Sequence, residues 1–128
     1  MEKACGGIII KDKKVLMIRQ TKGFIGFPKG HVEKNETEIE TAIREIEEET
    51  NIKSLLDKNK RYTIYYSPKP NTNKEVVYFL GKVVNDKNPK PQKGETEEIM
   101  WVDIDKVEEK LSFDNIKDMW QKVLKDIK

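Results

Sequence analysis

The residues best suited to chemistry in this chain are carboxylates gathered on one short segment. Between residues 36 and 49 the sequence contains seven glutamates and one basic residue, Arg44. At about 100° per residue, this segment predicts a helix with an aliphatic stripe on one side and glutamates on the other. The stripe consists of Ile39, Ala42, Ile43 and Ile46, and the opposite arc consists of Glu38, Glu45, Glu48 and Glu49.

Like charges on such a helix repel each other, so stability alone does not explain the arrangement. Glu36/Glu40 and Glu45/Glu49 are four residues apart, and each pair costs roughly a few tenths of a kcal/mol. A hard dication such as Mg²⁺ takes oxygen ligands, and carboxylates three or four residues apart on a helix can converge on it. The alternative is a solvated face, because glutamate is a good helix former and acidic surface helices are common. The neighbouring residues favour the cation site.

The spacing of those neighbours resembles the sequence motif of the Nudix hydrolases. The matching residues are Gly30, Glu36, Arg44, Glu45, Ile46, Glu48, Glu49 and Ile52. The family has glycine where this chain has Asn51. Because that position ends the helix and asparagine tolerates a left-handed conformation, we expect this departure to be structurally conservative.

The resemblance implies a hydrolase that acts on nucleoside diphosphates linked to another group, usually with Mg²⁺ or Mn²⁺. By position in the motif, Glu48 and Glu49 are the implied principal metal ligands. Glu45 is an additional ligand or the group that orients or deprotonates water, and the Lys29 backbone carbonyl joins the coordination sphere. A further acidic ligand is expected from the loop before the last strand, where Glu98 is our choice and Glu95 the alternative.

The other motif residues have implied supporting roles. Arg44 orients the glutamates by ion pairing, and Glu36 ties the preceding loop to the helix. Gly30 permits a backbone conformation that other residues resist, and Asn51 ends the helix.

Two segments outside the helix indicate the substrate class. Residues 27–33, FPKGHVE, resemble the corresponding loop of the asymmetric diadenosine tetraphosphate hydrolases, which implies that Lys29 and His31 contact a long polyphosphate. Residues 65–83 resemble a later segment of the same subfamily. There Tyr66 is placed to stack on adenine, Lys69 and Lys74 to reach phosphates, and Tyr78 either to contact substrate or to lie in the core, as Tyr65 and Phe79 also could.

The leading interpretation is therefore hydrolysis of diadenosine tetraphosphate to ATP and AMP. One alternative is a pyrophosphohydrolase that acts on damaged deoxynucleoside triphosphates or on RNA 5′ ends. A damaged-nucleotide enzyme needs a polar pocket for the base edge, and no residues here indicate one. A second alternative is a nucleotide-sensing module without catalysis, but such modules often lose the motif glutamates that this chain retains.

Composition excludes several other classes. The chain has 128 residues and a net charge of +2, which predicts one domain over residues 1–128 and argues against nucleic-acid binding through a broad basic surface. A single cysteine, Cys5, excludes an internal disulfide, and a single histidine, His31, excludes a multi-histidine zinc site. No apolar run suits a membrane span, and from the residues at the N-terminus we expect no secretory signal. We expect a cytoplasmic monomer whose partner is a small nucleotide.

Residue patterns predict the elements that position these groups. Strands are expected at residues 4–10, 15–18, 52–56, 61–66, 75–84 and 99–102, and loops at 21–26, 67–74 and 85–98. The acidic helix is expected over residues 36–50, with Asn35 as N-cap and Glu38 completing a capping box. A short helix is expected at 104–111, and an amphipathic helix from Asp114. This pattern predicts an α+β or α/β fold, and the resemblance implies an α/β/α sandwich with one long helix on each side of a mixed sheet.

Overall fold

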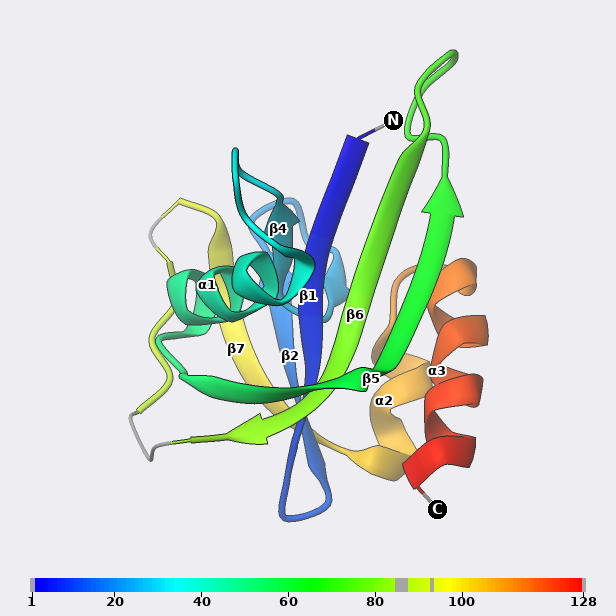
Figure 1. Ribbon diagram of the computed structural model, residues 1–128. Coiled ribbons are helices and arrows are strands. Elements are labelled where there is room, and N and C mark those ends of the chain that lie inside the picture. The colour runs from blue at the N-terminus through cyan, green and yellow to red at the C-terminus, as the bar shows by residue number, and fades with distance from the viewer. Residues whose placement is uncertain (1, 85–87, 93, 128) are drawn as a thin grey trace.

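The computed structural model describes residues 2–84, 88–92 and 94–127, which form a mixed β-sheet with helices on both sides (Figure 1). β1 (Glu2–Lys11) and β6 (Lys74–Val83) are parallel, whereas the other strand pairs are antiparallel. The strand order is β3-β2-β1-β6-β5, with β4 paired to β1 and β7 paired to β2. The bounds of these strands are β2 (Lys14–Gln20), β3 (Ile25–Gly26), β4 (Lys29–His31), β5 (Ser54–Tyr66) and β7 (Thr96–Asp103).

The two long helices lie on opposite faces of the sheet, as predicted. Figure 1 shows α1 (Glu38–Thr50) across one face and α3 (Asp114–Ile127) against the other. A short 3-10 turn, η1 (Ile104–Lys106), and α2 (Val107–Lys110) connect β7 to α3, where a short helix was expected. Among the described residues, no helix has both the length and the apolar character that crossing a membrane requires.

Side chains along a strand point alternately to the two faces of the sheet, and here both faces are apolar, so each is covered by a helix. In β1, Ala4 and Ile8 belong to the cluster packed against α3, whereas Cys5 and Ile9 belong to the clusters packed against α1. Successive strand side chains point to opposite faces, so a strand apolar at every position must be covered twice. The buried residues of α3 are Ile116, Met119, Trp120 and Val123, which follow the predicted amphipathic spacing.

The start of α1 differs from the prediction. Thr37 is the N-cap and forms the capping box with Glu40, because its backbone is extended whereas Asn35 has a positive φ of 69°. Glu36 therefore lies before the helix, and the predicted helical repulsion between Glu36 and Glu40 was wrong.

Strand boundaries also differ in places. The predicted strands at residues 52–56 and 61–66 form one strand, β5, with a register shift between Leu56 and Arg61. The predicted loops at 21–26 and 67–74 contribute β3 and the first residue of β6. Of the predicted loop at 85–98, residues 85–87 and 93 lie outside the described residues, and residues 96–98 belong to β7.

Candidate active site

Glu49 lies on the buried side of α1, not on the exposed arc that the sequence predicted, and is 4% exposed. It follows Ile46 by three residues and Ala42 by seven, so it continues the stripe that faces the sheet. Its Oε1 accepts a hydrogen bond from the Lys29 backbone N–H at 2.7 Å. Burial raises the pKa of Glu49 to about 8, while the Lys29 N–H acts in the opposite direction.

Arg44 connects the other carboxylates of the motif. Its Nε donates to Glu36 Oε2 at 2.7 Å and its Nη1 donates to Glu45 and Glu48, each at 3.1 Å. Its Nη2 donates to the His31 carbonyl at 3.0 Å, which ties β4 to the helix. The Arg44 hydrogen bonds hold the pKa of Glu36 at about 2. This geometry agrees with the positioning role expected for Arg44 and Glu36.

Gly30 does not have the unusual backbone conformation expected from the sequence, because its φ is not positive. Its missing side chain instead lets the β4 backbone approach Glu45 directly. A Cβ at Gly30 would lie 2.0 Å from the Glu45 carboxyl, a distance that no side chain can occupy. Burial raises the pKa of the Glu45 carboxyl, and the nearby Glu48 and Glu95 act in the same direction. The glycine therefore brings the carboxylate against the backbone of the preceding loop.

Asn51 ends α1 in the left-handed conformation, with φ 63° and ψ 19°. Its backbone N–H donates to the Glu47 carbonyl at 2.7 Å, which closes the last turn of the helix. The expectation that asparagine can replace the family's glycine here is confirmed, since the position has the backbone conformation for which both residues are suited.

An acidic cavity of about 620 Å³ lies between α1, β4 and the segment before β7. Its titratable lining residues are Lys22, Lys29, His31, Glu33, Glu45, Glu49 and Glu95. Glu98 lies elsewhere: it pairs with Arg19 across β2 and β7, with 3.0 Å between Arg19 Nη1 and Glu98 Oε1. Of the two acids considered for the additional ligand, the structure brings Glu95 to the motif and not Glu98. The reason is that β7 begins at Thr96, which leaves Glu95 as the last loop residue.

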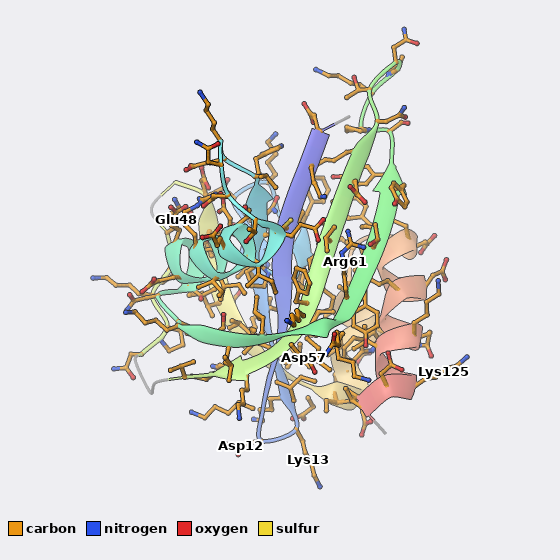
Figure 2. The ribbon with its side chains drawn as sticks, viewed as in Figure 1. Asp12, Lys13, Glu48, Asp57, Arg61 and Lys125 are labelled. Atoms are coloured by element: carbon orange, nitrogen blue, oxygen red, sulfur yellow. The ribbon has the colours of Figure 1, made fainter. Side chains whose placement is uncertain are left out.

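Glu48 lies on the exposed side of α1 (Figure 2), and its side chain is 45% exposed. Within the described ranges, no three His, Cys, Asp or Glu side chains stand close enough to hold a metal ion as they are. The physical reason is that Arg44 engages Glu45 and Glu48, while Glu49 turns to the Lys29 N–H.

The donor set nevertheless fits a hard dication. Its side-chain donors, Glu45, Glu48 and Glu49, offer carboxylate oxygens only, and Mg²⁺ prefers oxygen ligands. Glu49 is buried, and burial raises the pKa of its carboxyl more than the nearby Lys29 lowers it. A dication would add positive charge beside this carboxyl.

A basic cavity of about 600 Å³ adjoins the acidic one, and Gln20, Lys22 and Lys29 line both. The basic cavity contains a third lysine, Lys74, and no aspartate or glutamate. Burial and the proximity of Lys74 lower the pKa of Lys29, and burial and the same lysine lower the pKa of His31. Cations crowded together in this way favour an anionic ligand.

Aromatic side chains form much of the remaining lining: Phe24, Phe27, Tyr66, Tyr78 and Phe113. Lys74 Nζ lies 6.0 Å from the centroid of the Tyr66 ring. The Tyr78 hydroxyl is buried, and within the described part of the chain it has no hydrogen-bond partner. The structure thus brings Tyr66 and Lys74 together with Lys29. Tyr78, for which the sequence left both substrate contact and core open, is fully buried in the core and also lines this cavity.

Of the residues named from the segment 65–83, three lie outside the two cavities. Lys69 is exposed in the loop before β6, and Tyr65 is 64% exposed and donates to Glu75. Phe79 is a core residue. The sequence reasoning missed Lys22, Phe24 and Phe113, because a basic or aromatic residue in a loop gives no signal until the fold brings loops together.

The fold and the cleft define an α+β domain whose acidic helix borders a lysine-rich cavity. A model of the NUDIX domain matches residues 2–121, and the chain therefore belongs to the Nudix family. An Ap4A hydrolase of C. elegans in a binary complex superposes with a TM-score of 0.87 over 99% of this chain and 98% of that one, at 24% identity. A MutT protein of Methanosarcina mazei gives a TM-score of 0.83 over 99% and 95% of the two chains, at 22% identity. At these identities the likeness shows the fold.

A curated relative adds a sequence match over part of the chain. An ADP-ribose pyrophosphatase of Methanocaldococcus jannaschii is 42% identical over 73 residues. The match covers 51% of this chain and 40% of that protein.

Proposed function

We propose that this protein is a cytoplasmic hydrolase that uses Mg²⁺, or Mn²⁺, to cleave diadenosine tetraphosphate with water into ATP and AMP. The observation that supports this most is the division of the cleft by charge. One cavity has four glutamates, and the adjoining one has three lysines, several aromatic residues and no acid. A substrate that is both polyanionic and aromatic, and is cleaved beside a dication, matches this division.

In this proposal Glu45, Glu48 and Glu49 hold the metal, with the Lys29 carbonyl and Glu95 as further ligands. Bound there, the dication neutralises phosphate oxygens and lowers the pKa of an attacking water. Arg44 keeps Glu45 and Glu48 on the same side of α1 through its two hydrogen bonds of 3.1 Å.

Glu45 is the proposed residue that orients water or accepts its proton. Its raised pKa brings it closer to the working pH of a general base. The water oxygen bonds to phosphorus, the bond from that phosphorus to the bridging oxygen breaks, and the bridging oxygen leaves with the other product.

The basic cavity is the proposed site for the phosphate chain and one adenosine. Lys29 and Lys74 neutralise phosphate oxygens that the metal does not reach, and the neutral His31 donates one N–H. Tyr66 stacks on an adenine, an interaction worth about 1 to 3 kcal/mol. The buried Tyr78 hydroxyl gains the hydrogen-bond partner that it lacks among the described residues.

A product analysis tests the proposal. Diadenosine tetraphosphate is incubated with the protein and Mg²⁺, and the nucleotides are separated. We expect equal amounts of ATP and AMP, and no hydrolysis with EDTA. Two molecules of ADP per substrate would contradict the regiochemistry, and the absence of turnover would contradict the activity.

ADP-ribose is a second candidate substrate, favoured by the 42% identical relative. It offers a diphosphate and one base, so it would leave part of the lysine cluster unused. Values of kcat/KM for both substrates, together with a damaged deoxynucleoside triphosphate and a 5′-triphosphate RNA, decide between them.

A further inference from the structure

The first turn of α1 is bound to the sheet by a bidentate ion pair. Arg61 Nε donates to Glu38 Oε1 and Arg61 Nη2 donates to Glu38 Oε2, each at 2.8 Å. Arg61 projects from β5 on the side of the sheet that α1 covers (Figure 2). Its remaining nitrogen, Nη1, donates to Thr63 Oγ1 at 3.1 Å, so every nitrogen of the guanidinium is engaged. A planar guanidinium bound in this way fixes the direction of its partner as well as the distance.

Two neighbouring strands complete this contact. Lys3 Nζ of β1 forms a second ion pair with Glu38. Glu75 of β6 lies between the two cations, 3.6 Å from Lys3 Nζ and 4.0 Å from Arg61 Nη2. The Tyr65 hydroxyl donates to Glu75 at 3.1 Å. Three strands thus converge on one carboxylate at the start of the helix.

Glu38 lies on the same side of α1 as Glu45. The two residues are seven positions apart, so they differ by only about 20° around the helix axis. Both face the sheet, since Glu38 contacts β1 and β5 while Glu45 lies against Gly30 of β4. A rotation of α1 that moved Glu45 away from β4 would therefore also break the ion pairs of Glu38.

The contact also stands far from the other attachment of the helix. The hydrogen bonds that Arg44 makes within α1 turn with the helix, so they cannot fix its rotation relative to the sheet. Near the C-terminal end, Glu49 is bound to the Lys29 N–H. Glu38 precedes Glu49 by eleven residues, which is about 16 Å along the axis. Two attachments so far apart define both the tilt and the rotation of the helix.

We propose that Arg61 is a positioning residue of the metal site: through Glu38 it sets the rotation of α1 and thereby the direction of Glu45 and Glu49. Arg61 lines neither cavity, so it acts through the helix and not on substrate. The consequence for metal binding rests on the function proposed above, whereas the restraint on the helix does not.

Arg61→Met removes the guanidinium and tests the restraint in metal-free protein. The Lys29 amide, which donates to Glu49, and the Gly30 amide, which belongs to the backbone against Glu45, report the position of these two acids. In proton–nitrogen correlation spectra with EDTA we expect both amide resonances to shift and the Lys29 amide to exchange faster with solvent. Binding of Mn²⁺ without substrate, followed by electron paramagnetic resonance, should weaken by about tenfold.

Tyr62→Phe is the matched control. Tyr62 is the next residue of β5, and its hydroxyl donates to Asp126 of α3 on the other side of the sheet, at 2.5 Å. This variant should lower the Tm without moving the two amide resonances or the Mn²⁺ affinity. Arg61→Lys keeps the charge without the planar fork and should recover part of the affinity. In a Glu38→Ala background, Arg61→Met should have no further effect, because both changes remove the same contact.

Unmoved Lys29 and Gly30 resonances in folded Arg61→Met protein would overturn the restraint, as would an equal loss of Mn²⁺ affinity in Tyr62→Phe. If Arg61→Met does not fold, Lys3→Met removes the other cation and the same two resonances decide. A parent that binds no Mn²⁺, with resonances that do move, would refute the proposed metal site alone. An Mn²⁺ affinity that Arg61→Met leaves unchanged would refute the positioning role alone.

Discussion

The Glu49 carboxylate accepts a hydrogen bond of 2.7 Å from the backbone N–H of Lys29, and this contact joins α1 to β4. The next two residues of β4 also contact side chains of α1. Gly30 lies against the Glu45 carboxyl, and the His31 carbonyl accepts from Arg44 at 3.0 Å. Three consecutive residues of β4 thus contact three side chains of α1. These contacts fix the strand whose Lys29 lines both cavities.

The Glu49 contact predicts an unusual dependence of stability on pH. The pKa of about 8 in the folded protein exceeds the ordinary glutamate value of 4.5, so the folded protein keeps a proton that the unfolded chain releases. Without metal, stability should therefore fall as the pH rises from about 4.5 to about 8, by an amount on the order of a few kcal/mol. Glu49→Gln should remove this fall and be more stable than the parent at pH 8.

Thermal unfolding in EDTA at several pH values measures the effect. Mg²⁺ at pH 8 should then raise the Tm of the parent more than that of Glu49→Gln, because only the parent binds it well. Parallel curves of Tm against pH for the two proteins would show that Glu49 is not the titrating group.

Glu48→Gln should lower catalytic activity strongly and change the stability of the fold little. The Glu48 side chain is 45% exposed and pairs with Arg44 at 3.1 Å, a contact worth less than about 1 kcal/mol at the surface. If Glu48 is a metal ligand, kcat should fall by about 100-fold or more. A change in kcat below about threefold at saturating Mg²⁺, with the fold intact, would remove Glu48 from the ligand set.

Gly30→Ala should damage the site through packing. The added methyl group would lie 2.0 Å from the Glu45 carboxyl, so this carboxyl must leave its position and its contact with Arg44. Overpacking of this kind costs about 1 to 3 kcal/mol. Gly26→Ala is the matched control for stability, because a Cβ there meets no atom within 4 Å. Equal denaturant midpoints for the two variants would contradict the close approach.

Asn51→Gly restores the residue that the family motif has at this position. Because φ is 63° and ψ is 19°, glycine adopts the conformation without strain, while it adds freedom to the unfolded chain. The two effects oppose each other, and we expect the free energy of unfolding to change by less than about 1 kcal/mol. Asn51→Val is the contrasting variant, since a β-branched residue resists positive φ and should be clearly destabilising in urea titrations. Equal stability of the valine variant would argue against the left-handed cap.

Much of the fold follows from periodicity in the sequence. Two amphipathic helices and strands with consecutive apolar residues require a sheet covered on both sides, and the structure has that arrangement. The prediction for Glu49 failed because its residue type was given more weight than its position. Its place three residues after Ile46 already put it on the buried side, but carboxylates are seldom buried.

The cleft was less accessible to prediction than the helix. Glu36, Arg44 and Glu45 belong to one segment, so their spacing already brings them together. The basic cavity joins residues from the loop before β3, from β4, from β6 and from the turn before α3, and their meeting depends on strand order. Spacing along the chain therefore did not reveal Lys22, Phe24 or Phe113.

Lys74 offers the most direct test of how the cleft recognises phosphate. It is 9% exposed, lines the basic cavity and lowers the pKa of Lys29 by its proximity. Lys74→Met keeps the length of the side chain and removes one charge-assisted contact, worth about 1.5 to 3 kcal/mol. The KM for diadenosine tetraphosphate should rise by about 10-fold to 100-fold, with a smaller rise for a diphosphate-linked substrate such as ADP-ribose.

Lys69→Met is the control for this variant, because Lys69 is exposed and lines neither cavity. It removes the same charge from the exposed loop before β6 without touching the cleft, so its KM should match that of the parent at physiological salt. If the two variants raise KM equally, the lysines act through a general surface field. If only Lys74→Met raises KM, and raises it more for substrates with longer phosphate chains, the buried lysines contact the additional phosphates.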